Sequence, residues 1–186
     1  MPGEVNEIDP DKPRNYFAYG SNMNRHQMSR RFKKSDSEIR FYSRVYLPNW
    51  KFIICGGGYA SIDHCSPTDV AMGNDRVWGS LYIIEAVDEA ILDGYEGVSI
   101  HLYTKEYMDF FVCPPGKEDI PPEDLEKVNG LVYVATRSDK GLINDEYIPR
   151  MEDAVNDRDT ALPKEYVEKW MRPELDPHRD VPKAFV

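Results

Sequence analysis

The spacing of apolar residues, which changes near residue 136, most constrains how this chain folds. Up to that point, aromatic and β-branched residues come in short runs, and glycine, proline or asparagine separates one run from the next. Such runs are typical of strands joined by turns. They predict strands at residues 16–19, 41–47, 51–55, 59–62, 77–84, 107–113 and 131–136. The first two thirds of the chain are therefore expected to consist mainly of strands.

Helical spacing dominates the final third. Apolar residues at positions 147, 148, 151, 154 and 155 share one face of a helix, with Asp145 as its expected cap. A second helix is expected after Pro163, a residue suited to the first helical position, with apolar residues at 166, 167, 170 and 171. Two helices therefore close the domain.

Two shorter helices are expected among the strands. Residues 24–32 are polar and basic, which suits a helix on the surface. Residues 89–95 predict another helix, capped by Asp88, because its carboxylate can accept hydrogen bonds from the free amides of a first turn. Ile91, Leu92 and Tyr95 would then face inward.

The length and composition of the chain fit one domain. A chain of 186 residues with 41% hydrophobic residues can bury about two thirds of its unfolded surface. We expect a flexible lead-in at 1–15 with no secretory signal, a domain at 16–172 and a polar surface tail at 173–186. The proline-rich, charged residues 114–130 predict a loop inserted between two strands.

The charge of the chain excludes several classes of partner. It carries 33 acidic and 23 basic side chains and a net charge of −10 at pH 7, which repels nucleic-acid backbones and anionic lipid headgroups. No apolar run approaches the roughly 20 residues that cross a bilayer. We therefore expect a soluble protein that binds neither nucleic acid nor membrane.

Three cysteines, Cys55, Cys65 and Cys113, indicate a reducing compartment. An odd number without CxxC spacing argues against a disulfide framework and against a four-thiolate zinc site. His64 lies beside Cys65, but no second histidine has the spacing of a structural zinc site. The sequence therefore predicts a cytoplasmic protein with ordinary free cysteines and no metal.

Two other motifs have plain structural interpretations. The glycines at 56–58 lack the lysine and hydroxyl residue of a phosphate-binding loop and predict a β-bulge or a kink. The basic residues within 30–34 predict a solvated face. No GxSxG motif or histidine pattern indicates a serine hydrolase.

The motif YFAYGSN at residues 16–22 is a stronger candidate for a functional site. A strand that ends in Gly-Ser-Asn leaves consecutive backbone amides directed away from the sheet, where they can hold an anion or a developing oxyanion. Glycine permits the close approach of a ligand. Taken alone, a Gly-Ser-Asn motif is more often a simple turn than a site.

At this point the chain resembles a known family. The segments YFAYGSNM, WGSLYIIEAVDEAILDGYEGV, DEYIPRMEDAV and LPKEYVEKW occur with the order and spacing of the γ-glutamylcyclotransferases, across residues 16 to about 171. This resemblance implies an α+β fold in which peripheral helices surround a compact barrel of strands. It also implies a reaction without metal or cofactor, in which a γ-glutamyl amide closes to 5-oxoproline and releases an amine.

The resemblance implies roles for particular residues. Carried over by position, Glu96 is the catalytic acid and base, and substrate is bound by Tyr19, Gly20, Ser21, Asn22, Tyr103 and Tyr147. At neutral pH the substrate's α-amino group is an ammonium, so a carboxylate must take a proton from it and pass it to the leaving nitrogen. A partly enclosed Glu96 should have a raised pKa that suits both tasks.

Other interpretations stay open at this stage. Glu96 fits a surface charge, Tyr103 and Tyr147 fit core packing, and a member of this fold can bind a ligand without turning it over. YGSN favours γ-glutamyl amino acids or dipeptides as substrates, and an alternative is the trimming of glutathione adducts in a toxin pathway. The insertion at 114–130 and Met23 depart from the family pattern. The leaving amine and the formation of a homodimer are not fixed by the sequence.

Overall fold

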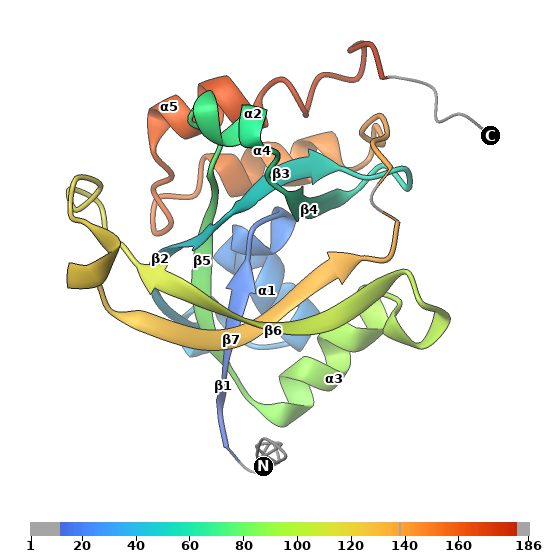
Figure 1. The fold of residues 1–186 in the computed structure, drawn as a ribbon. Helices are drawn as coiled ribbons and strands as arrows, with labels where there is room; N and C mark the ends of the chain where they lie inside the picture. Colours follow the sequence, from blue (N-terminus) through green and yellow to red (C-terminus); the bar gives the residue numbers. More distant parts are fainter. Residues whose placement is uncertain (1–11, 138, 182–186) are drawn as a thin grey trace, which may run out of the picture.

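The computed structural model describes residues 12–137 and 139–181. Within them, five strands close into a barrel in the order β1-β5-β2-β6-β7, and two further strands form a separate hairpin (Figure 1). The barrel strands are β1 (Arg14–Ala18), β2 (Arg40–Pro48), β5 (Arg76–Ile84), β6 (Tyr103–Val112) and β7 (Lys127–Ala135). The predicted α+β fold, a strand barrel with peripheral helices, is confirmed.

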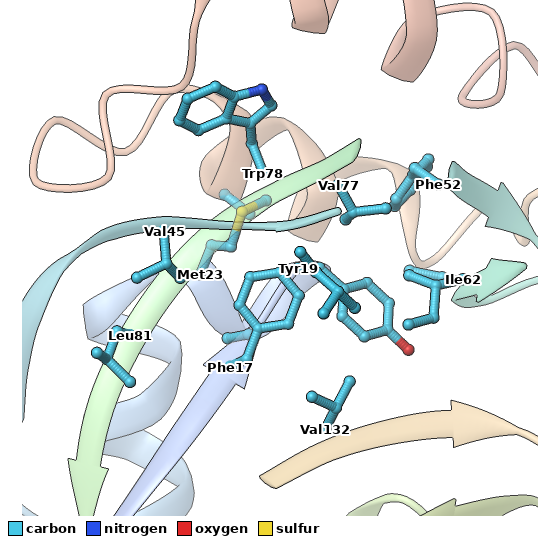
Figure 2. Close-up of a cluster of buried hydrophobic side chains, with 14 of the residues drawn as sticks. Phe17, Tyr19, Met23, Val45, Phe52, Ile62, Val77, Trp78, Leu81 and Val132 are labelled. Carbon is cyan, nitrogen blue, oxygen red and sulfur yellow. The ribbon is translucent and has the colours of Figure 1, made fainter. Parts of the chain in front are cut away.

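Strand β1 closes the barrel by pairing with β5 on one side and with β7 on the other. It runs antiparallel to β5, with Phe17 opposite Leu81, and parallel to β7 at Tyr16. Phe17 is fully buried and stacks on Phe110 of β6, with 5.4 Å between ring centroids. Figure 2 shows Phe17 and Tyr19 among aliphatic side chains of neighbouring strands. Burial of these rings fixes the strand that leads into the Gly-Ser-Asn motif.

The hairpin consists of β3 (Trp50–Ile54) and β4 (Ala60–His64). Asn49, in the left-handed region with φ of 67°, makes the tight turn from β2 that the sequence predicts. The glycines at 56–58 lie in the turn between the two strands of the hairpin. The predicted bulge or kink is therefore wrong, because the chain reverses direction at these glycines.

The helices surround the barrel and the hairpin (Figure 1). Their bounds are α1 (Arg25–Phe32), α2 (Pro67–Ala71), α3 (Ala86–Tyr95), α4 (Ile148–Val155) and α5 (Lys164–Tyr166), the last continued by a π-helical turn, Val167–Met171. Helix α1 is not the surface helix expected from its polarity, because Gln27, Met28, Ser29 and Phe32 are buried.

Two predicted helix caps are wrong. Glu85 is the N-cap of α3, and Asp88 is the third residue of the helix, where its carboxylate completes a capping box with the amide of Glu85. The N-cap of α4 is Tyr147, which makes no side-chain capping bond, so Asp145 does not cap this helix. Pro163 takes the N-cap position of α5, one residue before the helix begins.

The connection between β6 and β7 is a loop, as predicted, but β7 begins at Lys127, inside the predicted loop. The tail also differs from prediction, since Glu174 and Leu175 are buried instead of lying on the surface. At the other end, strand β1 begins at Arg14, within the predicted lead-in. Residues 1–11 and 182–186 lie outside the described residues.

Among the helices that the structure describes, none is long and apolar enough to span a bilayer.

Candidate active site

A cavity of about 320 Å³ opens where β1 ends. All seven residues singled out by the resemblance contribute to its wall: Tyr19, Gly20, Ser21, Asn22, Glu96, Tyr103 and Tyr147. They come from three distant parts of the sequence, the loop after β1, the segment from the end of α3 to β6, and the start of α4. The fold thus brings together residues whose shared location the sequence alone could not demonstrate.

The Gly-Ser-Asn motif forms the tight turn at the end of β1, with residues 21–23 in a 3-10 helix. The backbone amide of Ser21 donates a hydrogen bond to the Tyr147 hydroxyl, at 3.2 Å. A Cβ atom on Gly20 would lie 2.9 Å from that hydroxyl oxygen and 2.9 Å from Cβ of Ala60. Only glycine therefore allows Tyr147 and the hairpin to approach the loop this closely.

A directed chain of hydrogen bonds leads from α4 to Glu96. Arg150 Nε donates to Gln27 Oε1 at 3.0 Å, so the other end of the Gln27 amide must be its donor. Gln27 Nε2 donates to Asn22 Oδ1 at 2.8 Å. Asn22 Nδ2 in turn donates to Glu96 Oε1 at 3.3 Å. Because a guanidinium can only donate, Arg150 fixes the direction of the whole chain.

The same chain holds the Ser21 hydroxyl. Its oxygen accepts from Gln27 Nε2 at 2.8 Å and from Arg150 Nη2 at 3.1 Å. These two bonds occupy both lone pairs of the oxygen. The hydroxyl hydrogen of Ser21 therefore serves another acceptor, and the Tyr147 hydroxyl oxygen takes it.

Glu96 follows the last residue of α3, and its position depends on the glycine after it. Gly97 takes the left-handed conformation, with φ of 61°, and ends the helix there. A Cβ atom on Gly97 would lie 2.8 Å from Cδ1 of Leu102, so a side chain has no room at this position. The YEGV sequence thus turns the chain at the point where Glu96 meets the cavity.

The surroundings of Glu96 change its acidity. Burial of the carboxylate raises its pKa, and the positive charge of Arg31, the hydrogen bond from Asn22 and the charge of Arg150 partly offset that rise. A carboxyl group with a raised pKa is a stronger base than an ordinary one, and a pKa nearer to neutral lets one group both take and return a proton. This direction agrees with the shift expected from the sequence.

Two cavity tyrosines use their hydroxyl hydrogens within the protein. Tyr19 donates to the carbonyl of Tyr133, and Tyr103 donates to the carbonyl of Ala60 at 2.7 Å. Burial raises the pKa of both hydroxyls, so both stay protonated. The lone pairs that remain on their oxygens can accept hydrogen bonds from a cation such as an ammonium group.

Tyr147 differs from these two tyrosines because its oxygen accepts a bond from Ser21. Burial raises the pKa of the Tyr147 hydroxyl, which therefore keeps its hydrogen. The guanidinium of Arg150 lies over its ring, 5.0 Å from the centroid. Among the described residues no acceptor takes the Tyr147 hydrogen, so this hydroxyl is available as a donor.

Sequence reasoning missed several residues of this wall. Arg31 lines the cavity, so its assignment to a solvated face was wrong. Tyr95 was expected to face the core but is 59% exposed and lies at the cavity. Arg150, which also lines the cavity, and Gln27, which donates to Ser21 and Asn22 of the wall, were not considered. Spacing offered a signal, because Gln27 and Arg31 are four residues apart on α1, and Arg150 is three residues after Tyr147.

No group of three or more histidine, cysteine, aspartate or glutamate side chains within 12–137 and 139–181 is arranged to hold a metal ion. The three cysteines are free, as the sequence predicts, with Cys55 and Cys113 buried.

A family of sequences and several solved structures resemble this chain. Its sequence matches the family described as "Gamma-glutamyl cyclotransferase, AIG2-like" over residues 16–152. No curated protein sequence gives a significant match.

Solved structures share the fold. A γ-glutamyl cyclotransferase has a TM-score of 0.68 at 18% identity, over 92% of this chain and 95% of that one. The uncharacterized protein loc79017 from Homo sapiens has a TM-score of 0.67 at 19% identity, over 94% and 95% of the two chains. YkqA from Bacillus subtilis has a TM-score of 0.64 at 18% identity, over 92% of this chain and 56% of that one.

Proposed function

Because the chain belongs to the γ-glutamyl cyclotransferase, AIG2-like family, we propose that it converts γ-glutamyl amino acids to 5-oxoproline and a free amino acid. The family match bears out the resemblance carried by YFAYGSN and the later segments. The observation that best supports the proposed reaction is the Glu96 carboxylate, held by Asn22 beside the Gly-Ser-Asn turn in one cavity.

The first step uses Glu96 as a base. Its carboxylate takes a proton from the α-ammonium group, and the resulting amine attacks the γ-carbonyl carbon of the same molecule. A five-membered ring closes and the carbonyl oxygen becomes an oxyanion. The bent pose that brings nitrogen and carbon together supplies the proximity on which this step depends.

A protein donor faces the developing oxyanion in this proposal. The Tyr147 hydroxyl hydrogen, which has no acceptor among the described residues, is suited to this task, and the Ser21 hydroxyl supports it by bonding to the Tyr147 oxygen. Both groups are oriented before substrate arrives, Tyr147 by the Ser21 amide and Ser21 by Gln27 and Arg150. Preoriented donors stabilise a developing charge without reorganisation.

The second step uses the protonated Glu96 as an acid. The bond between the former carbonyl carbon and the leaving nitrogen breaks, and Glu96 returns its proton to that nitrogen. The carbonyl re-forms within the ring, and the ring nitrogen, which carries two hydrogens and a positive charge after its attack, gives one proton to the released amino group. The products are 5-oxoproline and an amino acid with an ammonium group. Its raised pKa lets Glu96 hold the proton between the two steps.

The test compares γ-L-glutamyl-L-alanine with its isomer α-L-glutamyl-L-alanine. We expect the purified protein to release 5-oxoproline and alanine in equal amounts from the γ-linked compound and nothing from the α-linked one, because only the former can close the ring from this pose. Mass spectrometry of the products measures both. Release of glutamate from either isomer would identify a peptidase, and binding without turnover would identify a ligand-binding module.

A further inference from the structure

Two arginines line the cavity, and they differ in how they are bonded. Arg150 donates to Gln27 and Ser21 and lies 3.5 Å from a carboxylate oxygen of Glu146. The side chain of Arg31 makes no hydrogen bond or ion pair with any described residue, and its Nη1 atom is buried without a partner. Arg150 is therefore committed to the protein, while Arg31 is not.

Stacking holds the guanidinium of Arg31 in place. Its central carbon lies 4.1 Å from the centroid of the Tyr95 ring. Such a contact is favourable between a guanidinium and the face of an aromatic ring, and it leaves the edge of the guanidinium, which carries the N–H groups, available to an acceptor. Tyr95 is the residue before Glu96, so the stack keeps Arg31 beside the base.

Glu96 is not the ionic partner of Arg31. No oxygen of Glu96 lies within 4.0 Å of a guanidinium nitrogen among the described residues, and its Oε1 accepts from Asn22. The charge of Arg31 nevertheless lowers the pKa of Glu96 more than any other group does. The guanidinium is thus near Glu96 while its own N–H groups are unpaired.

We propose that Arg31 binds a carboxylate of the substrate, through the edge of its guanidinium. This inference rests on the proposed function and restricts the substrate to compounds with a carboxylate next to a reacting nitrogen. A γ-glutamyl amino acid has two such groups, one beside the attacking nitrogen and one beside the leaving nitrogen. Each is two bonds from a nitrogen that exchanges a proton with Glu96, so each comes close to Arg31.

A matched pair of ligands separates the two carboxylates. γ-L-Glutamyl-L-alanine carries both of them, while γ-L-glutamyl ethylamide lacks only the carboxylate of the leaving group. Binding is measured by calorimetry in the Glu96→Gln protein, where no proton transfer to residue 96 consumes the ligand. This background also removes the influence of Arg31 on the Glu96 carboxylate, so a change in Kd reports binding alone.

The test variant is Arg31→Met and its control is Arg30→Met, both in the Glu96→Gln background. Arg30 is the preceding residue of α1, is exposed, and does not line the cavity. A hydrogen-bonded ion pair contributes about 1.5 to 3 kcal/mol, so Arg31→Met should weaken binding of γ-glutamyl alanine by about ten- to a hundred-fold. Arg30→Met should change Kd by less than about twofold.

The two ligands give distinct outcomes. Weaker binding of γ-glutamyl alanine alone assigns Arg31 to the leaving amino acid, and equal weakening of both ligands assigns it to the glutamyl α-carboxylate. An unchanged Kd for both, an equal effect of Arg30→Met, or no measurable binding by the Glu96→Gln parent would overturn the proposal. Release of 5-oxoproline by the wild-type protein tests the proposed reaction separately from this binding.

Discussion

Two sites in this molecule place an arginine against an aromatic ring, and they use it differently. Arg44 of β2 is 2% exposed and donates to the carbonyls of Cys113, Ala161 and Pro114, at 2.9, 2.7 and 3.0 Å. It also pairs with Glu118 and lies over the Trp78 ring. Arg31, at the cavity, has only its aromatic contact.

The difference separates structural from functional polar groups. Around Arg44 every interaction is with the protein itself, and the bonds hold the loop between β6 and β7 against the barrel. A buried cation whose partners are all present stabilises one conformation. In the cavity, the Arg31 side chain has no hydrogen-bond or ion-pair partner among the described residues, the Tyr147 hydroxyl hydrogen has no acceptor there, and Glu96 has a raised pKa. Such groups cost stability unless a ligand completes the site.

Glu96→Gln should give the largest effect and sharpen this contrast. Glutamine keeps the size and can still accept and donate hydrogen bonds, but it cannot take a proton from the substrate. We expect 5-oxoproline release at saturating γ-glutamyl alanine to fall by about 10²- to 10⁴-fold. A folded variant that keeps most of the wild-type rate would remove Glu96 from the mechanism.

Thermal melting of the same variant checks that the loss is chemical. The pKa of Glu96 is higher in the folded protein than its ordinary value. Its stabilising contribution is therefore present at low pH, where it is protonated, and is lost as pH rises through the folded pKa. At pH 7 the substitution should leave Tm unchanged or raise it.

Arg44→Met tests the other side of the comparison. The substitution leaves buried carbonyl oxygens and Glu118 without their donor, so we expect the free energy of unfolding to fall by about 3 kcal/mol. Urea denaturation measures the change. Arg40→Met is the control, because Arg40 makes an exposed pair with Glu85 and its loss should cost less than about 0.5 kcal/mol.

The folded fraction of Arg44→Met should retain its cavity. We expect its KM for γ-glutamyl alanine to stay within about twofold of the wild-type value. A much higher KM, at a temperature where the variant is folded, would show that the two sites are coupled and that the contrast drawn between them is wrong.

The strands, and the change from strand-like to helical spacing near residue 136, were predictable because each element buries apolar residues that lie close together in the sequence. Tyr16, Phe17 and Ala18 of β1 are all buried, and the apolar run that they form is enough to infer a buried strand without any distant residue. The cap at Asp88 was mispredicted because a second acidic residue, Glu85, lies three positions earlier and takes the N-cap of α3. The cap at Asp145 was mispredicted because α4 begins after Tyr147, with no side-chain capping bond.

Only the resemblance to the family predicted residues of the site. Matching positions with the family predicted Glu96 and the Gly-Ser-Asn turn. It did not predict Gln27 or Arg31, because the polarity of their segment indicated a surface helix. Their importance arises from a closed barrel that brings α1 against residues about 70 and 120 positions later in the chain. Such long-range pairing leaves no periodic signal in one sequence.

Gln27→Leu gives the smallest expected effect and tests whether the hydrogen-bond chain acts on Glu96. Leucine cannot donate to Asn22 Oδ1, so the Asn22 amide loses the partner that directs its Nδ2 group toward Glu96. That donor lowers the pKa of Glu96, and its loss should raise this pKa further. Since the free enzyme needs an ionised Glu96, the acidic limb of the kcat/KM profile should move to higher pH.

The expected change in kcat/KM and a matched control variant distinguish an effect on Glu96 from a general loss of stability. One hydrogen bond contributes about 0.5 to 1.5 kcal/mol, so kcat/KM on the acidic limb should fall by no more than about tenfold, with little change on the plateau. Ser29→Ala is the matched control, because Ser29 is a buried residue of the same helix whose hydroxyl donates to the carbonyl of His26. Ser29→Ala should leave the acidic limb of the kcat/KM profile at the same pH. If both variants lower the whole profile without moving the limb, Gln27 only supports the fold of α1 and does not position Asn22 for Glu96.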